Sequence, residues 1–259
     1  MKGDFAVLIL SCDKFSDLWP ASVSQFYRYF PNDDVRLYVG SNETACDEPG
    51  VIPVLSGKDC DWSRSFKKIL EQIEERTLAV IVDDYLLASR IDPKHLSMAV
   101  DFFFSTGAKH LKYWPNPPPD EPTTHTGIGQ YSRGAPYRAT VCGFWDRKYL
   151  MNLLLEGENA WDFEILGSYR TSYLDGFFAL NPPLFECRNL VEKGYWIPQS
   201  VDWANKEGVM LDLDRRPILK GVSKLRSRLQ MIYFHLMLRV PSQRRVRWMN
   251  TLRRLLISY

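Results

Sequence analysis

The 259-residue sequence lacks several features that would place it in common functional classes. No apolar run reaches the ~18 residues of a membrane-spanning helix. The first apolar run is short and meets Asp13, so we expect no signal peptide. The five cysteines are odd in number and scattered, with no CxxC pair or Cys/His metal spacing, which favours reduced thiols in the cytoplasm. The charged fraction of 25% and the apolar fraction of 45% are ordinary for a globular protein.

Acidic residues are missing from the end of the chain. Residues 215–259 hold twelve Lys/Arg and no Asp/Glu, so residues 1–214 hold the other 21 basic and all 31 acidic residues, a net charge of −10. Two predicted helical segments within 223–259, separated by Pro241, each pair an apolar stripe with an arginine-rich face. This pattern is typical of a helix on an anionic membrane surface, and a helical hairpin packed on the domain is the alternative. The acidic body argues against nucleic acid as a partner. We therefore expect a domain of residues 1–214 and a basic amphipathic helical tail of residues 215–259.

Short apolar runs alternate with amphipathic segments in the first third of the chain. This order predicts right-handed crossovers and a doubly wound α/β fold with a mainly parallel sheet flanked by helices. Residues 114–136, rich in Pro, Gly and Thr, are predicted to be a long exposed loop of the kind that acts as a lid. The expected strands are 5–12, 35–43, 50–57 and 78–88, and the expected helices are 18–30 and 64–77. Asp61 or Ser63 is expected to cap the second helix. A strand and a helix follow over 139–161, a further helix begins near 162, and a hairpin spans 185–196.

Two adjacent carboxylates, Asp83 and Asp84, fall where the apolar run LAVIV ends. In an open α/β sheet, ligands bind at the carboxyl ends of the strands. An unpaired buried carboxylate is costly, so a cation or hydrogen-bond donors should compensate the pair. Mg²⁺ or Mn²⁺ carrying a diphosphate suits it, because these ions prefer few carboxylates plus phosphate oxygens. A helix cap or a salt bridge to a lysine is the structural alternative.

The order strand, helix, strand, strand, helix, then IVDDY resembles the nucleotide-sugar-binding half of the GT-A glycosyltransferases. The segments DWSRSFKKILEQI, LKYWPNPPP, PYRATVCGFWDRKYLMNLL and GENAWDFEILGS are, in this order, similar to glycosyltransferases of bacterial polysaccharide assembly, of the capsule or O-antigen type. The Asp-x-Asp motif of that family is altered here, because the acids are adjacent and Tyr85 follows them. Some enzymes of this fold bind the diphosphate with basic residues in place of a metal, and Lys14 and Arg64 are the candidates for that role.

The resemblance implies a GT-A-like, inverting hexosyltransferase that moves a sugar from a nucleoside-diphosphate sugar to a saccharide acceptor. We expect a lipid-linked acceptor at the inner face of the cytoplasmic membrane. In such enzymes a carboxylate at a helix start takes the acceptor proton, and Asp162 and Glu164 are the candidates. We favour Glu164 as the base and Asp162 as the helix cap.

The same resemblance assigns further residues to the cleft. Ser11, Asp13 and Glu43 are expected at the nucleotide, and Arg133 and Arg138 at the diphosphate when the lid closes. Aromatic rings at Tyr137, Trp145 and Trp161 are expected to stack on acceptor sugars, although core packing is the commoner role of such rings. Two rival functions remain. One is a sugar nucleotidyltransferase, disfavoured because no glycine-rich phosphate loop follows the first strand. The other is a non-catalytic saccharide-binding or membrane-scaffold protein.

Overall fold

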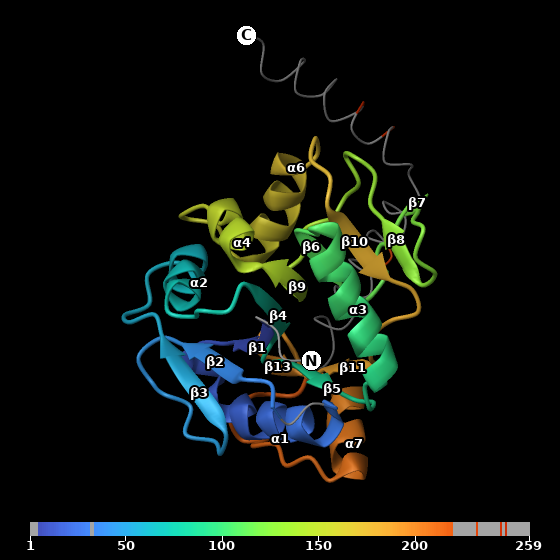
Figure 1. Ribbon diagram of the computed structural model, residues 1–259. Helices are drawn as coiled ribbons and strands as arrows, with labels where there is room; N and C mark the ends of the chain where they lie inside the picture. Colours follow the sequence, from blue (N-terminus) through green and yellow to red (C-terminus); the bar gives the residue numbers. More distant parts are fainter. Residues whose placement is uncertain (1–4, 32–33, 220–231, 233–243, 245–246, 248–259) are drawn as a thin grey trace.

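The computed structural model describes residues 5–31 and 34–219, together with the single positions 232, 244 and 247. The two amphipathic helices predicted in the tail lie outside the described residues. One nine-stranded sheet crosses the domain in the order β3-β2-β1-β4-β9-β6-β10-β8-β7 (Figure 1). Among the described residues, no helix combines the length and the apolar character needed to span a bilayer.

The first half of the sheet is parallel. Its strands are β1 (Phe5–Leu10), β2 (Leu37–Ser41), β3 (Val51–Leu55) and β4 (Thr77–Val82). The helices between them are η1 (Asp13–Leu18), a short 3-10 helix, α1 (Trp19–Tyr29) and α2 (Trp62–Glu71). Asp61 caps α2 by accepting a hydrogen bond from the Arg64 N–H, which confirms one of the two predicted caps.

The second half of the sheet is mixed. β9 (Gly143–Asp146) runs antiparallel between β4 and β6 (His110–Lys112). β10 (Phe177–Leu180) is parallel to β6, whereas β8 (Ile128–Gln130) and β7 (Glu121–Pro122) complete the edge in antiparallel pairing. The predicted fold class, a mixed and mainly parallel sheet flanked by helices, is confirmed. The predicted loop 114–136 contains the short strands β7 and β8.

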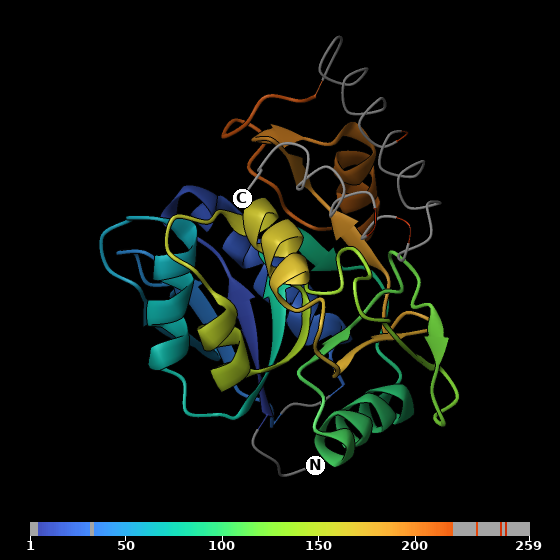
Figure 2. The ribbon, with the colours of Figure 1, turned by 90° about the horizontal axis from the view of Figure 1, so that it is seen from above.

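Helices cover both faces of the sheet because side chains of its strands alternate between them. Val7 and Ile9 face α1 and α3 (Pro93–Thr106), whereas Ala6 and Leu8 face the other layer. That layer contains α2 and α4 (Arg147–Leu153), which lie side by side in Figures 1 and 2. It also contains a helical segment made of α5 (Ala160–Asp162), the π-helical turn η2 (Phe163–Gly167) and α6 (Ser168–Arg170).

A third, smaller apolar cluster packs Leu86, which follows β4, against residues 190–201. The strand predicted over 78–88 is wrong in length: β4 ends at Val82, residues 83–84 form a turn, and β5 (Tyr85–Leu87) pairs instead with β11 (Cys187–Asn189). The predicted hairpin is present as β12 (Val191–Glu192) and β13 (Tyr195–Trp196), and α7 (Pro198–Glu207) follows. Ile218 pairs with Trp196, so the packed region continues past residue 214 to Leu219.

Candidate active site

One edge of the sheet collects polar residues from four strands. Ser11 follows β1, Asp83 follows β4, and Lys112 ends β6. These three strands run in the same direction, so their carboxyl ends lie at the same edge. Because β9 runs in the opposite direction, it begins at this edge, and Cys142 directly precedes it. The edge is where an α/β sheet binds ligands.

Asp83 is fixed by a short relay of hydrogen bonds. Its carboxylate accepts a hydrogen bond from the Ser11 hydroxyl, and the Ser11 oxygen in turn accepts one from the Trp19 indole N–H at 2.7 Å. Asp83 is only 7% exposed. Burial raises its pKa well above the ordinary range, and the adjacent charge of Asp84 raises it further. The relay positions Asp83 but leaves its charge poorly compensated.

Asp84 is the second under-compensated carboxylate. Burial raises its pKa from 3.8 to about 6, although its own backbone N–H and the positive charge of Arg216 oppose this shift. Arg216 forms a bidentate pair with Asp17 at 2.6 and 3.0 Å, donates to the Lys14 carbonyl at 3.0 Å, and stacks 4.2 Å over the Phe15 ring. Arg216 therefore brings positive charge to the side of the edge that carries Asp84.

Glu164 lies on the other side of the same edge. One of its carboxylate oxygens accepts a hydrogen bond from the Val141 N–H at 3.0 Å. Burial raises the pKa of Glu164, whereas the Val141 N–H and the charge of Lys112 lower it. The Lys112 ammonium donates to the carbonyls of Asn116 and Tyr137 at 2.6 and 3.0 Å. Burial lowers the pKa of Lys112 to about 7, against the opposing attraction of Glu164.

The two acidic groups meet through the start of β9. Glu164 accepts a hydrogen bond from the backbone of Val141, and the pKa of the thiol of the next residue, Cys142, is influenced by the backbone of Val82, directly before Asp83. Burial is the largest cause of the raised pKa of the Cys142 thiol, and the charges of Glu164 and Asp84 raise it further. The Tyr85 hydroxyl shows the same influences, again with burial as the largest cause of its raised pKa. Asp84 and Glu164 therefore act on the same local environment.

The turn that carries Glu164 is built differently from the predicted one. The expectation that Asp162 caps this helix is wrong, because Asn159 is the cap: its side-chain oxygen accepts from the N–H groups of Trp161 and Asp162 at 2.9 and 3.0 Å. The Asp162 carboxylate accepts a hydrogen bond from the Asn159 amide at 2.6 Å. Glu164 then falls in a π-helical turn, a conformation frequent at functional sites.

Two predicted contact residues are enclosed in the interior. Arg138 is fully buried, donates to the carbonyls of Ser132 and Leu174 at 3.1 and 2.6 Å, and stacks on Phe177, so the prediction that it binds the donor is wrong. Trp145 is also fully buried and stacks on His110 with 3.9 Å between ring centroids, so it offers no face to an acceptor sugar.

Gly143 belongs to this internal packing. Its φ of +146° and the His110 ring, which would lie 2.4 Å from an added Cβ, both require glycine. The close approach that Gly143 permits is therefore to His110.

The other predicted donor residues lie around the edge. Asp13 accepts hydrogen bonds from the backbone N–H groups that follow β2, of Asn42, Glu43 and Thr44, at 3.0–3.3 Å. Although burial opposes it, these bonds lower the pKa of Asp13. Lys14 and Glu43 are exposed. The functional assignment of these residues stays a prediction.

The remaining predicted residues form their contacts with groups other than Asp83, Asp84 and Glu164. Arg64 forms ion pairs with Asp61 and Glu156 at 3.5 and 2.6 Å, and Arg133 pairs with Asp175 at 2.7 Å. Of the predicted acceptor residues, Tyr137 is half-buried beside Lys112, with its carbonyl on the ammonium, and Trp161 is 71% exposed.

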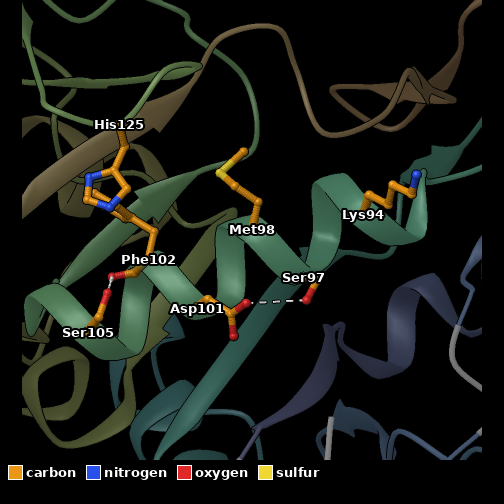
Figure 3. A pocket seen from close by; sticks show the side chains of 7 residues that line it. All are labelled: Lys94, Ser97, Met98, Asp101, Phe102, Ser105 and His125. Carbon is orange, nitrogen blue, oxygen red and sulfur yellow. Dashed lines mark hydrogen bonds between the residues drawn. The ribbon is translucent and has the colours of Figure 1, made fainter.

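A groove of about 450 Å³ lies elsewhere, along α3 (Figure 3). The His125 ring packs on Phe102 there, and the Ser97 hydroxyl donates to Asp101 at 3.3 Å. None of its lining residues was predicted to be functional, and we assign it no role. The lining residues are Lys94, Ser97, Met98, Asp101, Phe102, Ser105 and His125.

The chemistry of the acidic edge is compatible with a divalent cation. Across residues 5–31 and 34–219, no group of three or more His, Cys, Asp or Glu side chains is arranged to hold a metal. Mg²⁺ and Mn²⁺ need only one or two carboxylates when phosphate oxygens and water supply the other ligands. Asp83, which is buried, and Asp84, which is half-buried, are both short of positive charge and fit that requirement.

No protein-family model matches the chain, and no characterised protein matches it by sequence. Solved structures to which it is similar include S. aureus TarS 1–349 in complex with UDP, at 9% identity and a TM-score of 0.49, covering 70% of this chain and 59% of TarS 1–349. Another is the mannosyltransferase PcManGT from Pyrobaculum calidifontis in complex with GDP-Man and Mn²⁺, at 13% identity and a TM-score of 0.48, covering 75% and 59%. The chain thus spans about 59% of the length of each. A likeness of this size assigns neither an activity nor a substrate to this chain.

Proposed function

We propose that the protein is an inverting glycosyltransferase that uses a nucleoside-diphosphate sugar. The observation that carries the proposal is the convergence of Asp83, Asp84 and Glu164 on one sheet edge. Two under-compensated carboxylates suit a cation with a diphosphate, and a third carboxylate beside them suits proton removal. A non-catalytic saccharide-binding protein would not need three buried or half-buried acids at one edge, since withdrawing each from water costs free energy.

On the donor side, Asp84 and Asp83 would hold Mg²⁺ or Mn²⁺, which when bound neutralises the leaving diphosphate. Ser11 keeps Asp83 in place, and Asp13 fixes the backbone after β2, where we expect the nucleoside. Arg216 adds positive charge to the same side, from a part of the chain that was not predicted to take part. Lys14, exposed on η1, remains the candidate for a basic contact to the phosphates.

On the acceptor side, Glu164 would take the proton of the attacking hydroxyl. The oxygen then bonds to the anomeric carbon of the donor as the bond from that carbon to the diphosphate breaks, and attack from the opposite face inverts the configuration. Burial raises the pKa of Glu164 and so makes it a stronger base than an exposed carboxylate, while the Val141 N–H and the charge of Lys112 oppose that rise. Trp161 and Tyr137 stay the candidates for stacking on the acceptor.

The wider setting is also a proposal. The acid-free segment 215–259 would attract an anionic bilayer, where each basic residue near the surface contributes about 1 kcal/mol. We therefore propose a peripheral enzyme at the inner face of the cytoplasmic membrane, acting on a lipid-linked saccharide in the synthesis of a cell-surface polysaccharide.

Donor hydrolysis by the purified protein tests the reaction. A panel of UDP-, GDP-, dTDP- and CMP-sugars with and without Mn²⁺ identifies the donor, and transfer to a saccharide is then measured with Glu164→Gln. Gln can still accept the Val141 N–H, so we expect the fold to be kept and turnover to fall by about 10²- to 10⁴-fold. Calorimetry should show unchanged nucleotide affinity. Glu71→Gln, an exposed position on α2, is the matched control. Wild-type turnover in Glu164→Gln would remove the proposed base.

A further inference from the structure

The helical segment that carries Glu164 has an unusually apolar outer surface. Six large side chains between residues 161 and 174 are 41–74% exposed. Three of them, Trp161, Ile165 and Tyr169, recur at every fourth position along α5, η2 and α6, and two more follow in the turn after α6. We call this set the outer stripe; it consists of Trp161, Ile165, Leu166, Tyr169, Tyr173 and Leu174. Figure 1 shows α6 at the periphery of the molecule.

The opposite face of the same segment is packed inside. Phe163, Gly167 and Thr171 are buried, and the Glu164 carboxylate points to the Val141 backbone. The segment therefore directs Glu164 to the start of β9 and its apolar side chains to the exterior. A helix with side chains is about 10–12 Å across, so whatever covers the outer stripe lies about that far from the proposed base.

The charges around the outer stripe are compensated. Glu158 pairs with Arg170 at 2.5 Å, and Asp175 pairs with Arg133 at 2.7 Å. Asp162 is held by the Asn159 amide. No acid follows in residues 215–259, which hold twelve basic residues. An anionic surface would thus meet apolar and aromatic groups with two ion-paired carboxylates beside them, and the sequence of the same chain supplies basic residues that such a surface attracts.

We propose that the outer stripe is the surface by which this protein rests on an anionic lipid bilayer. Trp and Tyr favour the boundary between water and hydrocarbon, and a patch of this apolar content is unusual on a protein surface without a partner. The base then faces the headgroup layer from about one helix diameter away. This inference rests on the proposed function. If the protein is the proposed glycosyltransferase, this orientation implies that the acceptor is a saccharide whose lipid anchor stays in the bilayer.

Flotation of the full chain with vesicles of phosphatidylglycerol and phosphatidylcholine tests the surface. The double variant Leu166→Ser/Tyr173→Ser removes two exposed members of the outer stripe and no predicted site residue. We expect its partition coefficient to fall at least about tenfold. The matched control Ile52→Ser/Phe104→Ser removes similarly exposed side chains from β3 and α3 and should bind as wild type does. The loss should persist at high salt, which screens the attraction of the basic segment.

Unchanged vesicle binding of the stripe variant at both salt concentrations would overturn the proposal. So would a lipid-free dimer that the variant dissociates in analytical ultracentrifugation, because a second copy would then cover the stripe. A lipid-free Trp161 that acrylamide cannot quench, compared with Trp161→Phe, would likewise overturn it. Donor hydrolysis without lipid separates this proposal from the enzymatic one. If wild type hydrolyses no donor but the variant still loses vesicle binding, the enzyme assignment fails and the lipid surface stands.

Discussion

Replacing Asp84 with asparagine should make the protein more stable and less active. In the folded protein the pKa of Asp84 is raised from 3.8 to about 6, mainly by burial. The folded state therefore keeps a proton that the unfolded state releases between these two pH values, and the wild-type protein loses stability as the pH rises through this window. Above pH of about 6 the full cost of the buried charge is present.

The magnitude follows from the two pKa values. A difference of about 2 corresponds to about 3 kcal/mol, a figure that already includes the attraction to Arg216. Because the asparagine amide is also a polar group withdrawn from water, we expect Asp84→Asn to be about 1–3 kcal/mol more stable near neutral pH. Near pH 4 the gain should largely disappear, because Asp84 is then protonated in the folded state and about half protonated in the unfolded state, so little of the free-energy cost of the buried charge is present. Binding of a nucleoside diphosphate with Mn²⁺ should be weaker above pH about 6, where Asp84 is ionised, since asparagine is a poorer ligand for a hard cation.

Urea unfolding near pH 4 and above pH about 6, with calorimetry against the nucleotide, measures both effects. Asp202→Asn, exposed on α7, is the control and should change neither. A variant that is no more stable than wild type above pH about 6 would refute the view that Asp84 is an under-compensated charge. Increased stability with unchanged nucleotide affinity would support the view that the charge of Asp84 is under-compensated but would contradict a role for Asp84 in donor binding.

Two further predictions concern the surroundings of Glu164. In Lys112→Met the loss of a positive charge should raise the pKa of Glu164 further, so the acidic limb of a pH profile of kcat/KM moves to higher pH; an unmoved limb would show that Lys112 does not act on the base. Asn159→Ala should lower the free energy of unfolding by about 1 kcal/mol in urea, because two N–H groups lose their acceptor, whereas Asn159→Asp should retain most of it. Equal losses in both variants would contradict the capping role.

The donor half of the edge could be predicted because it depends on local patterns. Parallel strands bring their carboxyl ends together, so apolar runs that end in Ser11 and Asp83 are enough to bring these residues to the same edge of the sheet. The cap Asn159 was also within reach, since Asn before a helical run is a strong N-terminal signal. Asp162 was preferred because it precedes the acidic candidate, although the side chain of Asn159 is the one that meets the free N–H groups.

Other parts of the site depend on long-range packing that no spacing reveals. The antiparallel direction of β9 brings Val141 and Cys142 to the edge, and nothing in their own sequence sets that direction. Lys112 was not predicted as a site residue, because a lysine at the end of an apolar strand usually indicates the start of an exposed loop. Arg138 lies in a loop-like sequence, but two carbonyl groups and the Phe177 ring hold it inside. Burial decides the role of such residues, and burial is set by the whole fold.

The bidentate pair between Arg216 and Asp17 joins residues that are 199 positions apart. While the nascent chain is still on the ribosome, β1 can pair with β2 and β4, but Asp17 has no partner until almost the whole domain has been made. The donor-side turn is therefore closed by one of the last segments to be translated. In folding intermediates that lack this closure the turn after β1 would be incomplete, so we expect the proposed site to form late in the folding of this domain.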